Sequence, residues 1–291
     1  MNVSTEQPWT IGRLLDWTAR FLAEKGSESP RLDAEVLLAD VLGCERIALY
    51  TRYDEVAGEE PRQRYRALIR RRVEGCPVAY LVGRKEFFSL RLEVGPAVLI
   101  PRPDTECVVI ECLRLLRGIA EPTMVDVGTG SGAIAIAVTK QHAGVRVTAT
   151  DLSPEALAVA QRNAARHGVA DRIRFVQGDV LAALGAEERF DLIASNPPYI
   201  PTEELAALPI GVRDYEPRPA LDGGPGGFVV FDRIVDQAPR HLKPGGWLVV
   251  EIGSAQEGPA RQRISAVHEF DLRKTVLDGS SHPRVLVARW Q

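Results

Sequence analysis

Residues 126–132 read Asp-Val-Gly-Thr-Gly-Ser-Gly, and this stretch decides the fold. An apolar run over residues 124–127 leads into it, and an apolar helical pattern continues over residues 131–141. Glycines between a strand and a helix let the backbone approach a ligand closely, and open α/β sheets bind their ligands at this end of the strands. The stretch therefore predicts the ligand-binding loop of a Rossmann-like sheet.

Beyond Glu106, apolar strands alternate with helical patterns. We expect strands at residues 124–127, 146–150, 172–177, 190–195 and 247–252. Such alternation implies right-handed crossovers and a mostly parallel sheet with helices on both faces. Residues 270–277 and 284–290 predict a C-terminal antiparallel hairpin that finishes the sheet. The expected fold class is α/β.

The first part of the chain has a different pattern. Apolar residues recur at steps of three and four from residue 11 to about residue 73, which predicts a small helical bundle. Residues 86–92 and 94–100 look like two extended runs that form a hairpin. We therefore expect a helical domain at 1–76, a linker with a β-hairpin at 77–103, and the sheet domain at 104–291.

Charge and composition exclude several classes of protein. The net charge of −3 argues against a surface tuned to nucleic acid, and no apolar run approaches the roughly 18 residues of a membrane span. The first residues lack the basic start and apolar core of a secretory signal, so we expect a cytoplasmic protein. The four cysteines and five histidines show no zinc-ligand spacing, and no metal is expected.

The glycine loop by itself fits two cofactors. Gly128, Gly130 and Ala133 also satisfy the GxGxxG/A pattern of nicotinamide enzymes. Asp126, two positions before the first glycine, favours S-adenosylmethionine as the cofactor. Its carboxylate would repel a pyrophosphate but suits the ammonium and sulfonium groups of S-adenosylmethionine.

Acidic residues after the next two strands complete the expected cofactor site. Asp151 suits the ribose hydroxyls, and Asp179 with Val180 suits the adenine. The predicted residues that bind S-adenosylmethionine, and its product S-adenosylhomocysteine, are Asp126, Gly128, Thr129, Gly130, Ser131, Gly132, Asp151, Asp179, Val180 and Asn196.

The fourth strand ends in Asn196-Pro197-Pro198-Tyr199. Two prolines stiffen the backbone, and the Asn196 side-chain oxygen with the Pro197 carbonyl can accept both hydrogens of a planar NH2 group. Tyr199 can stack on that planar group. Alignment of a weakly nucleophilic amide nitrogen would supply the catalysis. We therefore predict Asn196, Pro197 and Tyr199 as catalytic residues.

The Asn-Pro-Pro-Tyr sequence resembles the motif of methyltransferases that act on planar nitrogens, which include DNA adenine and protein glutamine methyltransferases. Other stretches resemble one branch, the peptide chain release factor glutamine methyltransferases. They are Pro-Val-Ala-Tyr-Leu-Val-Gly at 77–83, Glu-Phe-Phe at 86–88, Ile-Pro-Arg-Pro-Asp-Thr-Glu at 100–106, Tyr-Glu-Pro-Arg at 215–218 and Glu-Ile-Gly at 251–253. The resemblance covers essentially the whole chain.

The resemblance implies N5-methylation of the glutamine in the Gly-Gly-Gln motif of class 1 release factors, with no direct nucleic-acid contact. It places this glutamine against Asn196, Pro197, Pro198 and Tyr199. Phe87 and Phe88 either wall its pocket or pack in the core. The N-terminal helices would help to grip the release factor, and the arginine run at residues 62–72 is either part of that grip or the solvated side of a helix.

Three alternatives remain at this point. A ribosomal-protein glutamine methyltransferase shares the chemistry but should differ after Pro101-Arg102. A nucleic-acid adenine N6-methyltransferase should carry a basic target-recognition region, which the net charge of −3 disfavours. A nicotinamide-dependent dehydrogenase or a noncatalytic nucleotide-binding module fits the glycine loop alone. Oligomeric state and preference among release factors are not predicted.

Overall fold

The computed structural model describes residues 8–291, which form two compact units. The helical unit contains the described residues up to Gly83 together with Ile210–Tyr215. The sheet unit contains Arg84–Pro209 and Glu216–Gln291. Across the described residues, no helix combines the length and the apolar character that a membrane crossing requires.

The helical unit is built from short helices, two of which have clear end signals. Thr10 caps the first helix by accepting a hydrogen bond from the Arg13 backbone N–H at 3.2 Å, and Gly43 ends the second with a left-handed φ of 62°. The helices of this unit are α1 (Ile11–Glu24), α2 (Pro30–Leu42), α3 (Arg46–Thr51), α4 (Glu59–Val73), α5 (Val78–Val82) and α9 (Ile210–Arg213).

The core of the helical unit gathers the apolar faces of these helices. Leu15, Leu37 and Leu38 are fully buried in it. Tyr65 of α4 is also buried, and its hydroxyl donates to the Ala34 carbonyl at 3.0 Å, which satisfies the polar end of the side chain. The predicted helical bundle is therefore present, and α5 adds a helix where the sequence suggested only a linker.

The hairpin lies earlier in the chain than we expected. Its strands are β1 (Arg84–Phe87) and β2 (Leu90–Glu93), so the predicted run at 86–92 spans the turn and residues 94–100 form no strand. Phe88 and Ser89 turn the chain with φ of 50° and 59°. Two-residue turns of this kind usually contain Asn or Gly, and neither is present to mark the turn.

The sheet unit has seven strands in the order β5-β4-β3-β6-β7-β9-β8. The strands from β5 to β7 are parallel, and β9 pairs antiparallel with both β7 and β8. The strands are β3 (Thr123–Val127), β4 (Arg146–Asp151), β5 (Ile173–Gln177), β6 (Phe190–Ser195), β7 (Leu242–Glu251), β8 (Phe270–Leu277) and β9 (Pro283–Trp290). The predicted hairpin is confirmed, with its second strand inserted next to β7.

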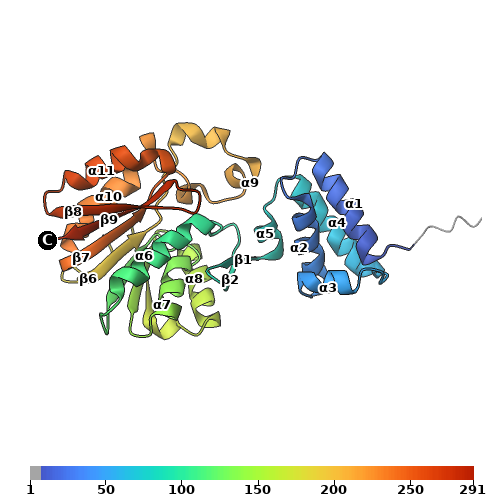
Figure 1. Ribbon diagram of the computed structural model, residues 1–291, viewed down its shortest axis with the longest axis horizontal. Coiled ribbons are helices and arrows are strands. Elements are labelled where there is room, and N and C mark those ends of the chain that lie inside the picture. The colour runs from blue at the N-terminus through green and yellow to red at the C-terminus, as the bar shows by residue number, and fades with distance from the viewer. Residues whose placement is uncertain (1–7) are drawn as a thin grey trace, which may run out of the picture. The chain divides into compact units, whose positions relative to one another are not determined.

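Helices cover both faces of this sheet (Figure 1). One face packs against α6 (Glu106–Leu116), α7 (Ala133–Gln141) and α8 (Pro154–Arg166), and the other against α10 (Val229–Gln237) and α11 (Glu257–Ser265). Burial on both sides explains why most positions of β3 and β6 are apolar and buried. The short 3-10 helices lie at Pro103–Thr105, Ala170–Arg172, Thr202–Ala207, Arg218–Ala220, Pro225–Gly227, Ala238–Arg240 and Ser254–Gln256.

Candidate active site

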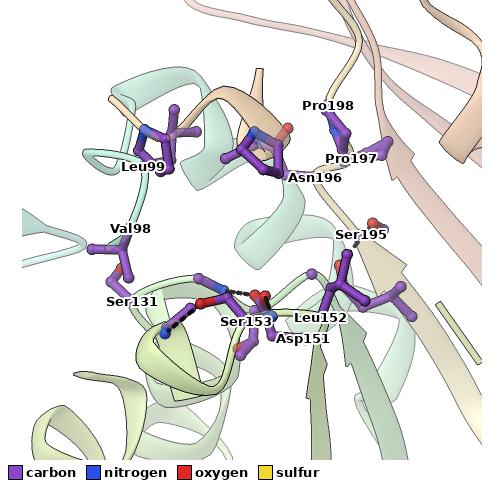
Figure 2. A pocket seen from close by; sticks show the side chains of 18 of the residues that line it. Val98, Leu99, Ser131, Asp151, Leu152, Ser153, Ser195, Asn196, Pro197 and Pro198 are labelled. Carbon is purple, nitrogen blue, oxygen red and sulfur yellow. Dashed lines mark hydrogen bonds between the residues drawn. The ribbon is translucent and has the colours of Figure 1, made fainter. Parts of the chain in front are cut away.

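A cavity of about 500 Å³ opens at the carboxyl ends of β3, β4 and β6. This volume is in the range of small-molecule and cofactor sites. The sequence-predicted residues that line it are Gly128, Thr129, Gly130, Ser131, Asp151, Asp179, Val180, Asn196, Pro197 and Pro198. Figure 2 shows Asn196 and Pro198 on one side of the cavity and Asp151 and Ser153 on the other.

The glycines of the loop have different structural roles. Gly128 and Gly130 have φ of 70° and 55°, and an added Cβ at either would meet nothing within 4 Å. Their backbone therefore faces open space in which a ligand can approach. Gly132 does not line the cavity, because it packs between helices: an added Cβ would lie 2.8 Å from Ile136 and 3.2 Å from Ala160.

Asp126 is buried beneath the loop and does not line the cavity. Its Oδ2 accepts hydrogen bonds from the Thr129 hydroxyl at 2.7 Å and the Ala135 backbone N–H at 3.1 Å, so Asp126 holds the loop in shape. Its Oδ1 is buried with no hydrogen-bond partner among residues 8–291. Burial raises the pKa of Asp126 to about 6, and the unpartnered carboxylate oxygen places negative charge beneath the loop, which favours a cationic group in the cavity above it.

Asp151 ends β4 and presents its carboxylate to the cavity. Oδ2 accepts from the Gly130 backbone N–H at 2.8 Å, and Oδ1 accepts from the Ser153 backbone N–H at 3.0 Å. Burial raises the pKa of Asp151, and these backbone donors oppose the shift. Because each carboxylate oxygen has a further lone pair, Asp151 can still accept from two adjacent hydroxyls.

Asp179 and Val180 form the third wall after β5. The Asp179 carboxylate is paired with Arg233, which also lines the cavity. Val180 has φ of 57°, a region that a β-branched residue rarely adopts, and the Thr150 hydroxyl donates to its carbonyl at 3.1 Å. Such strain at the wall of a cavity is typical of a ligand site.

Asn196 follows the last residue of β6 at the cavity edge. The Ser195 hydroxyl donates to the Val127 carbonyl at 2.8 Å, which joins the ends of β6 and β3. The Asn196 Nδ2 donates to the Thr105 hydroxyl oxygen at 3.0 Å. With the NH2 end anchored in this way, the Asn196 Oδ1 is left as an acceptor.

Tyr199 lies behind the residues that line the cavity rather than among them. Its carbonyl accepts from Gln256 Nε2 at 2.8 Å, which fixes the backbone after the two prolines. Burial raises the pKa of the Tyr199 hydroxyl, and the neighbouring Glu251 carboxylate adds to the shift. Tyr199 therefore stays protonated near neutral pH.

Phe87 and Phe88 do not line this cavity. Phe87 is buried in the core beneath the sheet, and Phe88 packs against the same core. The Phe88 backbone N–H donates to Glu106 Oε1 at 2.9 Å, which supports the strained turn of the hairpin. Phe87 is therefore a core residue in the structure, whereas Phe88 is only partly buried.

Sequence reasoning gave no role to several residues that shape the site. Thr105 lines the cavity and holds Asn196, and Glu251 is buried next to Thr105. Gly223 leaves room for the Pro198 carbonyl, which would lie 2.8 Å from an added Cβ. Thr105 and Glu251 belong to stretches already noted for resemblance, but their partners are distant in the sequence and could not be read from it.

The fold and the site together define a class. The sheet order departs from the dinucleotide-binding order 3-2-1-4-5-6 in its last hairpin, and Asp126 is an acid beneath the glycine loop. The residues fit S-adenosylmethionine, with open space at Gly128 and Gly130 and a free oxygen on Asp126. The protein is an S-adenosylmethionine-dependent methyltransferase with a Rossmann-like sheet.

Comparison with known proteins identifies the family. Residues 13–83 match the PrmC N-terminal domain, and residues 108–207 match the methyltransferase small domain. The chain is 43% identical over 289 residues to a release factor glutamine methyltransferase of Rhodopirellula baltica, covering 98% of both chains. It is 48% identical over 254 residues to the one of Geobacter sulfurreducens, covering 87% and 88%. The chain belongs to the release factor glutamine methyltransferase family.

A solved structure agrees on the fold. The hMettl16 catalytic domain, determined in complex with MAT2A 3′UTR hairpin 6, is 17% identical, with a TM-score of 0.56 over 77% of this chain and 81% of that one. At this identity the likeness concerns the fold alone. It confirms the α/β methyltransferase architecture expected from the sequence.

Proposed function

We propose that this chain transfers the methyl group of S-adenosylmethionine to the side-chain amide nitrogen, N5, of the glutamine in the Gly-Gly-Gln motif of class 1 peptide chain release factors. The observation that carries the proposal is Asn196, whose NH2 end is bound to Thr105 and whose oxygen is left to accept from an acceptor NH2 group. The relatives from Rhodopirellula baltica and Geobacter sulfurreducens, named release factor glutamine methyltransferases, support the choice of acceptor.

The cofactor supplies an electrophilic methyl group when it is bound. The loop from Gly128 to Ser131 would approach it, and the Asp126 Oδ1 would attract its ammonium group. Asp151 would accept from the ribose hydroxyls, and Val180 with Asp179 would hold the adenine. After the transfer, the same residues would bind the product, S-adenosylhomocysteine, until it dissociates.

The acceptor side acts by orientation. An amide nitrogen is a weak nucleophile, so the chain must present its lone pair to the methyl carbon in one fixed geometry. The Asn196 Oδ1 and the Pro197 carbonyl would accept the two amide hydrogens, and the prolines hold that carbonyl in place. Tyr199, which follows the two prolines after β6, would contact the planar acceptor group. No side chain needs to remove a proton before the methyl group moves.

Other features follow from the same function. We infer that residues 1–76 help to dock the release factor, that residues 77–103 link the two parts, and that residues 104–291 carry the transfer. Release factors act during protein synthesis, so the function implies a cytoplasmic location. Neither a metal nor a direct nucleic-acid contact is part of the proposal.

A labelling experiment tests the acceptor. The chain is incubated with methyl-labelled S-adenosylmethionine and, in separate reactions, with an unmethylated release factor, ribosomal proteins and an adenine-containing duplex. We expect label only in the release factor. Label only in ribosomal protein, or only in the duplex, would mean that the acceptor is a ribosomal protein or a nucleic-acid adenine instead. Binding of NAD in place of S-adenosylhomocysteine would show that the chain is not an S-adenosylmethionine-dependent methyltransferase.

A further inference from the structure

The Asn-Pro-Pro-Tyr segment after β6 ends in a peptide group that is held at both of its polar ends. The Tyr199 carbonyl oxygen accepts from Gln256 Nε2 at 2.8 Å. The N–H of the same peptide group, which belongs to Ile200, donates to the Leu221 carbonyl at 3.1 Å. Because a peptide group is planar, contacts at both ends oppose its rotation. Gln256 is the only side chain in this pair of contacts.

Backbone groups fix the direction of the Gln256 amide. Its Oε1 accepts from the Gly253 backbone N–H at 2.9 Å, while its Nε2 donates to the Tyr199 carbonyl. A backbone N–H can only donate, and a carbonyl oxygen can only accept. The reversed amide would place oxygen against oxygen and NH2 against N–H. Only one orientation of Gln256 therefore satisfies both contacts.

Two glycines enclose the contact between Gln256 and Tyr199. An added Cβ at Gly227 would lie 2.3 Å from the Tyr199 carbonyl oxygen and 2.7 Å from Gln256 Nε2. An added Cβ at Gly253 would lie 3.0 Å from Gln256 Oε1 and 3.5 Å from Cδ2 of the Tyr199 ring. The turn from Gly253 to Gln256 therefore lies against both the ring and the carbonyl of Tyr199.

The other end of the segment is held as well. The Ser195 hydroxyl donates to the Val127 carbonyl at 2.8 Å. Between Ser195 and Tyr199, the ring of each proline fixes one backbone dihedral angle. Few backbone angles remain free between the two held ends, so a shift of the Tyr199 peptide group would displace Asn196 and Pro197, which are proposed to bind the acceptor.

We propose that Gln256 is a positioning residue for methyl transfer, whose amide binds the Tyr199 carbonyl to the turn after β7 and so holds the Asn-Pro-Pro-Tyr segment in the geometry that presents the acceptor amide. The inference rests on the proposed function and adds to it the residue that connects the acceptor segment with the end of the neighbouring strand. Gln256 does not line the cavity, so it acts through Tyr199 and not on the substrate.

Two substitutions separate hydrogen bonding from packing. Gln256→Glu has nearly the same shape and keeps an oxygen for the Gly253 N–H, but near pH 8 it directs a carboxylate oxygen at the Tyr199 carbonyl oxygen. Gln256→Met fills a similar volume without an amide. If Gln256 only filled space, both variants would keep the activity of the wild type.

We expect kcat near pH 8 to fall about tenfold in Gln256→Met and about 100-fold in Gln256→Glu. The first variant loses the contact, and the second replaces it with repulsion, so the reacting groups are misplaced more strongly. KM for the release factor should stay within about threefold of wild type, because the loss concerns alignment in the transition state. Single-turnover and steady-state methylation measure the two quantities.

Two controls accompany these variants. S-adenosylhomocysteine affinity within about threefold of wild type, measured by calorimetry, shows that each variant is folded. Gln262→Glu is the matched control for the added charge, because Gln262 is exposed on α11, and its kcat should equal that of the wild type. If Gln256→Glu does not bind S-adenosylhomocysteine, Gln256→Met decides the question alone.

A kcat of Gln256→Met equal to that of the wild type would overturn the proposal, and so would a Gln256→Glu variant that is more active than Gln256→Met. A rise in KM with an unchanged kcat would overturn it too, since Gln256 would then contribute to binding and not to alignment. The wild type is assayed beside the variants, so absence of its activity would count against the proposed function instead.

Discussion

At the scale of single residues, the proposed function assigns cofactor and acceptor to different side chains. Asp151, which lines the cavity at the end of β4 and holds the loop through Gly130, is proposed to bind the cofactor. Asn196, whose NH2 end Thr105 anchors, is proposed to bind the acceptor. Substitutions at these two positions should therefore change different kinetic quantities.

Asn196→Ala should abolish methyl transfer with little effect on the cofactor. We expect turnover to fall by about 100-fold or more, because the acceptor amide loses an oriented dipole, and S-adenosylhomocysteine affinity to stay within about tenfold. Single-turnover methylation and calorimetry measure the two effects. Undiminished turnover would refute the role assigned to Asn196.

Asp151→Ala should do the opposite. Loss of hydrogen bonds from the ribose hydroxyls to a charged group predicts weaker S-adenosylhomocysteine binding by about 1.5 to 3 kcal/mol. Part of this loss would come from the Gly130 N–H, which Asp151 holds at 2.8 Å. Calorimetry at fixed pH measures it, with Asp179→Ala as a comparison, and unchanged affinity would show that Asp151 does not contact the cofactor.

At the scale of elements, the loop after β6 is held by a second loop. Residues 222–227 read Asp-Gly-Gly-Pro-Gly-Gly, and two of these glycines approach the backbone of Pro198 and Tyr199 so closely that a side chain does not fit. An added Cβ at Gly223 would lie 2.8 Å from the Pro198 carbonyl oxygen, and one at Gly227 would lie 2.3 Å from the Tyr199 carbonyl oxygen. Backbone atoms cannot move aside as a flexible side chain does.

Gly223→Ala should therefore displace the Asn-Pro-Pro-Tyr backbone. We expect kcat to fall about tenfold or more with S-adenosylhomocysteine affinity nearly unchanged, since the loop at Gly128 is untouched. Gly258→Ala is the matched control, because nothing lies within 4 Å of its added Cβ. Equal activity of the two variants would mean that the second loop does not position the acceptor residues.

Helices and strands in which apolar residues recur at a regular spacing could be predicted from the sequence. The strand at Phe190–Ser195 lies at the residues predicted for it. The turn at Phe88 could not be predicted, because strained φ values there have no glycine or asparagine to signal them. The α11 helix was missed because its apolar positions are few.

The candidate site was predictable to the extent that it follows strand ends. Asp151 ends β4 and Asn196 follows β6, and these strands are the two neighbours of β3, so their convergence on one cavity follows from sheet topology. The contact between Thr105 and Asn196 does not, since it depends on how α6 packs beside β6. Long-range side-chain contacts of this kind leave no periodic trace in a sequence.

At the scale of the whole molecule, two of the buried acids of the sheet unit have strongly raised pKa values. Asp126 and Glu251 have pKa values raised by burial to about 6 and about 7, from ordinary values of 3.8 and 4.5. The folded state therefore prefers their protonated forms. Their contribution to stability is fully present below the ordinary values and is lost as the pH rises through about 6 and about 7.

The free energy of unfolding without cofactor should reflect this. Between about pH 5 and pH 8 the wild type should lose stability, and Asp126→Asn should lose less over the same range. Asp278→Asn is the control, because backbone hydrogen bonding from His282 and the Arg284 side chain hold the pKa of Asp278 at about 2, outside the range. Urea unfolding measures the difference, and parallel curves for Asp126→Asn and wild type would contradict it.

The atom that receives the methyl group can be identified directly. A purified, unmethylated class 1 release factor is incubated with this protein and S-adenosylmethionine, digested, and analysed by tandem mass spectrometry. We expect one added methyl group on the side-chain nitrogen of the glutamine in the Gly-Gly-Gln peptide. An unmodified glutamine in that peptide, from protein that binds S-adenosylhomocysteine normally, would contradict it.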